Sequence, residues 1–195
     1  LSLYIFKTGD KSDKTIAIFC LCFCQIQLLE FLLWIDQSCG TINSTVTKLI
    51  AGFILLQPAS IFFGGLMYNT FNIPASYLRY LFLISLVIVI SSFWRFLSIS
   101  KQLCSTPDDV NKLQWDVYTV IDKFSFTDMC LHVFYFIGLI VPWILFKNKN
   151  KKYIVLTVII SSFIISNANF KQWESMWCFL ANILPILLIV YRQFK

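Results

Sequence analysis

Charged residues are scarce in this chain. They make up 13% of its 195 residues, which is about half of the share in an ordinary water-soluble domain. Hydrophobic residues make up 58% of the sequence, and the mean hydropathy is +0.73. So few charges do not cover the surface of a soluble domain of this length. The composition therefore predicts a protein that lies in a lipid membrane.

Residues for metal, cofactor and hydrolytic chemistry are also lacking. The only histidine is His132, whereas a zinc hydrolase needs several imidazole or thiolate ligands that converge on the metal. Every lysine lies in a polar break or at the end of an apolar run, so none can form the buried Schiff base of a retinal protein. Glycine-rich phosphate loops and the Gly-x-Ser-x-Gly and His-Glu-x-x-His motifs are missing. The sequence therefore predicts neither an enzyme nor a bound cofactor or metal.

Long apolar runs separated by short polar breaks are the main feature that is present. A helix needs about 20 residues to cross the hydrocarbon layer of a bilayer. Runs such as Leu81–Ile90 are apolar on every face, whereas the strands of a membrane barrel alternate. The predicted fold is therefore an all-α polytopic transmembrane helix bundle, one domain over residues 1–195. Its six spans are expected at residues 15–35, 49–68, 77–98, 129–146, 153–170 and 176–191.

The first residues, Leu1–Phe6, form a further short apolar run. Two interpretations of this run stay open. One is the end of a seventh span that precedes the sequence, and the other is a short arm that lies on the membrane surface.

Basic residues beside the spans predict the orientation, because lysine and arginine favour the cytoplasmic side. In a chain of six spans, ten of the 16 basic residues fall on one face. The short turn Lys147–Lys152 contributes four of them. Both ends of the sequence are thus expected in the cytoplasm, with residues 99–126 as the longest loop of the opposite face. The basic residues form no single stripe, so nucleic acid is not an expected partner. Attraction of this turn to anionic lipid headgroups explains its charge.

The loops of the non-cytoplasmic face carry two further signals. Asn43 begins an Asn-Ser-Thr glycosylation sequon. Cys39 and Cys104 lie in two different loops of this face, where a disulfide can form. Two free thiols are the alternative. In the longest loop, the acidic segment 107–123 is the expected contact for a protein partner.

Polar side chains inside the spans are the candidate site. Such groups are costly in a membrane, usually face the interior of a bundle and often mark function. Most of them fall in the non-cytoplasmic half of the predicted spans, which predicts a polar cavity that opens to that side. The residues expected to line it are Gln27, Glu30, Trp34, Gln57, Arg95, Asp128, His132, Glu174 and Asn182.

A structural interpretation of the same residues stays open. Asp128 and Glu174 lie near span ends, where water hydrates them, and tryptophans such as Trp34 often form an interfacial belt. Glu30 differs because it lies at least one turn inside the first span. It is expected either to pair with Arg95 or His132 or to be protonated.

A set of spaced residues resembles a group of uncharacterised multi-pass membrane proteins encoded by large DNA viruses of protists and algae. The set consists of Gln25-Ile-Gln27-Leu-Leu-Glu30-Phe-Leu-Leu-Trp34-Ile-Asp36, then Cys39 and Asn43, Gln57-Pro58, and Trp173-Glu-Ser-Met-Trp177-Cys178. The resemblance implies a seven-helix bundle whose first helix lies outside this sequence, and a viral membrane. It implies no activity.

Three functional hypotheses follow. The first is a multi-pass integral membrane protein of viral origin whose polar cavity binds or senses a small ligand or lipid. The second is a structural protein of the virion or host membrane that holds a partner through residues 107–123. The third is a small proton-coupled transporter in which Glu30 and His132 titrate. The lipid bilayer is a partner in each case, and a homo-oligomer is compatible with all three.

Overall fold

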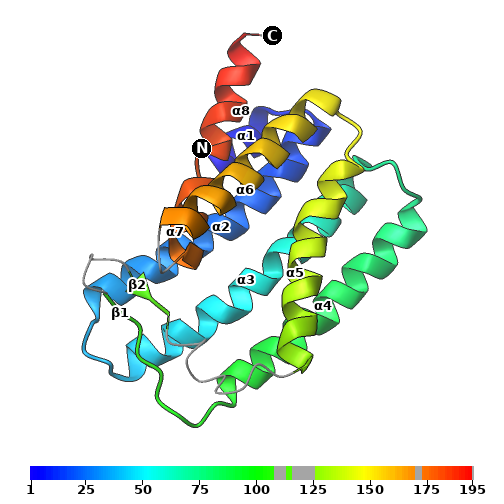
Figure 1. The fold of residues 1–195 in the computed structure, drawn as a ribbon. Coiled ribbons are helices and arrows are strands. Elements are labelled where there is room, and N and C mark those ends of the chain that lie inside the picture. Colours follow the sequence, from blue (N-terminus) through cyan, green and yellow to red (C-terminus); the bar gives the residue numbers. More distant parts are fainter. Residues whose placement is uncertain (108–112, 116–125, 170–172, 195) are drawn as a thin grey trace.

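The computed structural model describes residues 1–107, 113–115, 126–169 and 173–194, and this part of the chain is mostly helical (Figure 1). The helices are α1 (Ser2–Thr8), α2 (Lys11–Ile35), α3 (Thr41–Tyr68), α4 (Ala75–Leu97), α5 (Phe126–Ile144), α6 (Lys149–Asn169), α7 (Trp173–Ala181) and α8 (Leu184–Gln193). Two short strands, β1 (Thr106–Pro107) and β2 (Leu113–Gln114), pair in antiparallel fashion. The all-α prediction is confirmed for the described residues.

Four helices are long and apolar enough to cross a membrane, namely α2, α3, α4 and α6. The remaining two predicted spans correspond to shorter apolar helical segments, Met129–Ile144 and Trp177–Gln193. The described part of the chain is therefore compatible with an integral membrane protein, whereas the exact number of six spans is not confirmed.

The last predicted span is two short helices instead of one. After α7, the N–H groups of Asn182 and Ile183 donate to the carbonyls of Phe179 and Leu180, three residues back. Pro185 follows in the first turn of α8. Proline has no N–H and its ring clashes with the carbonyl four residues earlier, so it disfavours a regular helix through this joint.

Helix α3 lies at the centre of the bundle. In its most apolar window 67% of the residues are buried, against 22% in α4. Close approach to α2 depends on Gly64, because a Cβ atom there would lie 3.1 Å from Thr15 Cα. At the middle of α3, a Cβ atom on Gly138 of α5 would lie 2.9 Å from Pro58 Cβ. Helix α3 thus serves as the common support for α2, α4 and α5.

The apolar run at the start of the sequence lies in α1. This helix packs against α2 and α8, and its Ile5 is fully buried. Among the described residues, α1 therefore contributes to the core.

One end of the bundle carries Lys147, Lys149, Lys151 and Lys152, and is called the basic end here. The turn after α3 meets the turn between α5 and α6 at this end. Asn72 N–H donates to Leu145 O at 2.8 Å, and Lys147 N–H donates to Thr70 O at 2.9 Å. The Thr15 and Thr70 hydroxyls hydrogen-bond to each other at 3.0 Å. These bonds fix the ends of α2, α3, α5 and α6 relative to one another.

The opposite end is held by the disulfide between Cys39 and Cys104, whose Cα atoms lie 4.9 Å apart. Asn43 supports the same junction. Its Nδ2 donates to the carbonyls of Asp36, at 2.8 Å, and Ser105, at 2.9 Å. The segment that follows α4 is thereby fastened to the start of α3.

Candidate functional site

Three of the predicted cavity residues take part in two hydrogen-bonded pairs in the structure. Gln27 Nε2 donates to Glu30 Oε2 at 2.7 Å, and Glu30 is only 6% exposed. Gln57 is fully buried in α3, and its Oε1 accepts a hydrogen bond from the Tyr135 hydroxyl of α5 at 2.6 Å. The first pair lies within α2, whereas the second joins two helices beside Pro58.

The other candidates differ in exposure, and the side chains of two of them lie outside the described part of the structure. Trp34 and Arg95 are exposed, and His132 is half-buried on α5. Asn182, at the joint between α7 and α8, donates to Cys178 O at 2.9 Å. Asp128 and Glu174 lie in α5 and α7, but their side chains are outside the described part of the structure. The polar cavity therefore stays a prediction.

Asn43 of the glycosylation sequon is fully buried. Both atoms of its side-chain amide are used, since its Oδ1 also accepts from Ser105 N–H at 2.9 Å. A glycan is bulky and belongs on the surface. The fold therefore argues against glycosylation at Asn43.

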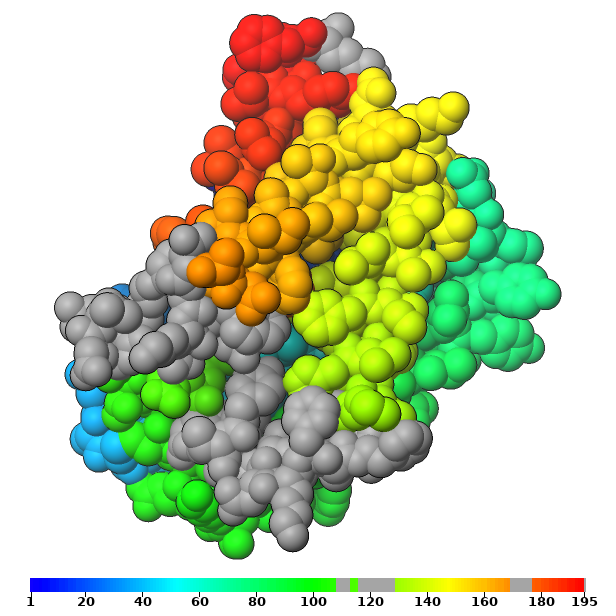
Figure 2. Space-filling view, viewed as in Figure 1, coloured from blue at the N-terminus to red at the C-terminus, as the bar shows by residue number. Residues whose placement is uncertain are grey.

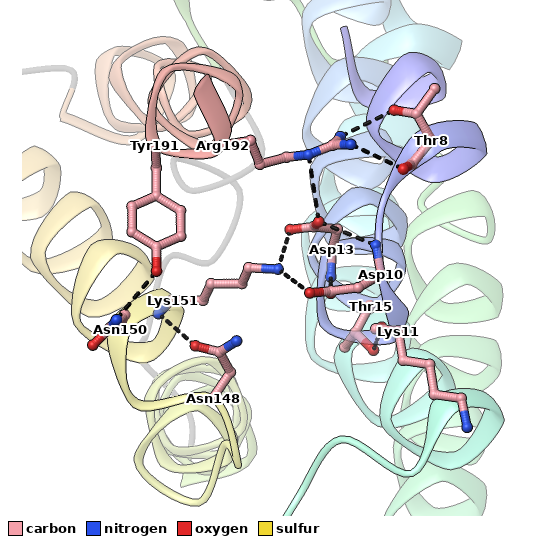
Figure 3. A network of polar contacts seen from close by, with 10 residues as sticks. All are labelled: Thr8, Asp10, Lys11, Asp13, Thr15, Asn148, Asn150, Lys151, Tyr191 and Arg192. Carbon is pink, nitrogen blue, oxygen red and sulfur yellow. Dashed lines mark hydrogen bonds and ion pairs between the residues drawn. The ribbon is translucent and has the colours of Figure 1, made fainter. Parts of the chain in front are cut away.

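A cluster of ionised groups at the basic end was not predicted from the sequence (Figure 3). The ion cluster consists of Asp10 and Asp13 at the start of α2, Lys151 in α6 and Arg192 in α8. Lys151 Nζ lies 2.7 Å from Asp10 Oδ2 and 2.6 Å from Asp13 Oδ1. Lys151 is only 2% exposed, although the sequence places it in a basic turn that faces lipid headgroups.

Helix capping positions the members of the ion cluster. Asp10 and Asp13 form a capping box at the start of α2, in which each carboxylate accepts from the other residue's N–H. Asn148 Oδ1 accepts from Lys151 N–H at 3.1 Å and so caps α6. A lysine near a helix N-terminus is unfavourable for the helix dipole, and the two aspartates offset this.

Arg192 extends the ion cluster to α1. Its Nη1 and Nη2 donate to Thr8 Oγ1 at 3.0 Å and to Thr8 O at 2.9 Å, and its Nε lies 3.8 Å from Asp13 Oδ2. Two cations thus balance two carboxylates. This balanced cluster, in which Lys151 and Asp13 are buried, joins α1, α2, α6 and α8 and is best explained as a structural clamp.

The pKa of Asp10 lies below its ordinary value. Burial raises this pKa. Hydrogen bonds from Lys151 and from Asp13 N–H, together with the charge of Lys151, lower it by a larger amount. A carboxyl group with a depressed pKa in the folded state stabilises the fold above its unfolded pKa. This stabilisation is lost as the pH falls through the folded pKa.

Replacing Asp10 with asparagine should therefore lower the thermal midpoint at pH 7, and the difference from the wild type should shrink as the pH is lowered from 5 towards 2. Thermal unfolding of both proteins in detergent over this pH series measures the effect. A difference that stays constant across the series would mean that the carboxylate charge of Asp10 does not contribute.

A cavity of about 160 Å³ lies between α3, α4 and α5. We call it the lateral cavity. Only apolar residues line it, among them Phe62, Phe71, Leu78, Leu81, Ile137 and Val141. Helices α4 and α5 both pack on α3 but make little contact with each other. Figure 2 shows the start of α4 beside the end of α5 on this face of the molecule.

The lateral cavity reaches the surface of the protein. Phe71 and Leu78 are almost completely buried at its inner side, whereas Ile137 and Val141 are exposed. It therefore opens between α4 and α5 toward the surroundings of the bundle, where apolar side chains such as Tyr80, Leu83 and Ile84 are also exposed.

Comparisons with protein-family models, with curated proteins and with solved structures find no match. The class of the protein thus follows from its own fold: an all-α bundle whose apolar helices are compatible with a multi-pass membrane protein.

Proposed function

We propose that this protein is an integral membrane protein that binds a membrane lipid, with one acyl chain in the lateral cavity. The observation that carries the proposal is the wholly apolar lining of this cavity. A cavity of about 150 Å³ lined by leucine, isoleucine and phenylalanine stays dry and takes up apolar molecules. In a bilayer, the apolar group available to fill such a space is an acyl chain.

The opening of the lateral cavity supports entry from the bilayer. Its walls continue into the exposed apolar faces of α4 and α5. An acyl chain can therefore move into the cavity without crossing a polar surface. Filling the space restores the dispersion contacts that its lining side chains otherwise lack.

This proposal keeps the lipid part of the first sequence-based hypothesis and places the site elsewhere. The polar cavity around Glu30, the structural role through residues 107–123, proton-coupled transport and the viral origin stay predictions. The proposal includes a membrane orientation with the basic end in the cytoplasm, which the excess of lysine and arginine at that end supports.

Filling the lateral cavity with a larger side chain should displace the lipid. Val141 lines the cavity and is 42% exposed, so phenylalanine at this position can turn inward at the opening. We expect Val141→Phe to lower the occupancy of bound lipid about fivefold, which corresponds to about 1 kcal/mol. Native mass spectrometry of the protein released from nanodiscs measures the lipid that stays bound.

Val133→Phe is the matched control, because Val133 lies on the same helix, is 52% exposed and is not part of the cavity lining. This variant should retain lipid like the wild type. Equal lipid retention by Val141→Phe and Val133→Phe, or no retained lipid on the wild-type protein, would refute the proposed function.

A further inference from the structure

The lateral cavity follows α5 toward the basic end. The residues of α5 that line it, and the residue that follows the helix, recur at helical spacing from Phe134 to Leu145. With a rise of ~1.5 Å per residue, this stretch is about 16 Å long. That is about half of the ~30 Å hydrocarbon layer. A lipid chain that lies along this stretch occupies one leaflet, and its headgroup lies where α5 ends.

A cationic side chain lies at this end of the cavity. Lys147 follows the cavity-lining residue Leu145 by two positions and is exposed. Its Nζ donates to Asn69 O at 2.8 Å and to Asn69 Oδ1 at 2.9 Å. These bonds hold the ammonium group beside the end of α3, and its third N–H can bind a further acceptor.

The carboxylates at the basic end are already engaged elsewhere. Asp10 and Asp13 are in ion pairs with Lys151 and Arg192. Among the residues that the structure describes, no carboxylate lies within salt-bridge distance of Lys147. An exposed cation therefore lies beside an apolar cavity, and no described carboxylate neutralises it. A phosphate-bearing headgroup joined to an acyl chain matches both features.

We infer that the ligand of the lateral cavity is an anionic phospholipid whose phosphate is bound by Lys147. This inference rests on the proposed lipid binding and adds the headgroup class. Lys147 supplies a point charge that Asn69 holds in place.

The test compares two lipids in nanodiscs, phosphatidylglycerol and phosphatidylcholine, which share acyl chains and differ in net charge. Native mass spectrometry of the wild type should show a preference of about fivefold for phosphatidylglycerol. The variant Lys147→Gln should lose this preference and still retain phosphatidylcholine as well as the wild type does. Lys7→Gln, an exposed cation of α1 at the same end, should keep the preference.

The possible results separate the inference from the proposed function. A wild-type protein that retains both lipids equally overturns the headgroup assignment and leaves acyl-chain binding intact. Loss of preference in Lys7→Gln as well would show that general surface charge is responsible, and this also overturns the assignment. A wild-type protein that retains neither lipid refutes the proposed function itself. Inorganic phosphate is the remaining probe: thermal stabilisation by free phosphate that disappears in Lys147→Gln would assign the site to a soluble anion instead of a lipid.

Discussion

Replacing Lys151 with methionine is expected to lower the free energy of unfolding by about 3–5 kcal/mol, because breaking one side of a buried ion pair leaves an uncompensated charge. Asp13 is the residue left behind, and its side chain is only 3% exposed. Arg192 compensates for the lost partner only in part, since its Nε lies 3.8 Å from Asp13 Oδ2, whereas Lys151 Nζ lies 2.6 Å from Asp13 Oδ1. Methionine keeps the length of the side chain, so the loss of charge dominates the effect.

Lys152→Met is the matched control for this substitution. Lys152 is the next residue and is only half-buried, and its Nζ donates to Ile144 O at 3.0 Å instead of to a carboxylate. Its replacement should cost less than about 1 kcal/mol. Unfolding by denaturant in detergent micelles measures both variants. Equal destabilisation by the two variants would contradict a buried ion pair at Lys151.

Adding Asp13→Asn to Lys151→Met should restore part of the lost stability, because the double variant buries no unpaired charge. The capping box would be weakened but not abolished, since an asparagine oxygen still accepts from Asp10 N–H. A double-mutant cycle of these two substitutions gives the coupling energy. A coupling energy near zero would assign the effect of Lys151→Met to packing instead of charge.

Removing the disulfide between Cys39 and Cys104 should have the second-largest effect. The bond closes a loop of 65 residues that contains α3 and α4. A disulfide typically stabilises the folded protein by about 2–4 kcal/mol. Helices that stay inserted in the membrane restrict the unfolded chain, so the lower part of this range is expected. Denaturant unfolding of the double variant Cys39→Ser, Cys104→Ser measures the loss.

Cys24→Ser serves as the control, because Cys24 is a free, exposed cysteine. This variant should unfold like the wild type. Thiol labelling of the denatured wild type should give five reactive cysteines without a reductant and seven after reduction. Seven labelled cysteines before reduction would contradict the disulfide.

Hydropathy alone predicts where the helices lie, because a membrane helix is apolar on all faces that meet lipid. Their ends depend on contacts that hydropathy does not contain. Helix α3 begins at Thr41 instead of residue 49, since its polar first two turns bond to the segment after α4 through Asn43, Ser44 and Thr47. A hydropathy profile assigns these residues to a loop.

The candidate site was harder to predict for a similar reason. Residue spacing indicates which side chains share one face of a helix, as it does for Gln27 and Glu30. It does not indicate how two helices are rotated or shifted relative to each other. Lys151 therefore looked like a surface lysine, although the fold buries it in ion pairs with Asp10 and Asp13 at the start of α2. The lateral cavity is formed by ordinary apolar residues that do not fill the space between them, and no motif marks such a gap.

The joint between α7 and α8 has a consequence for biosynthesis. The two helices have 9 and 10 residues, so each extends about 15 Å, half of the hydrocarbon layer. A nascent chain that offers only one of them to the insertion machinery lacks the apolar length to partition into lipid alone. Helix α6 packs against α7, so in the proposed membrane protein we expect the final segment to enter the bilayer as the second arm of a hairpin that α6 begins.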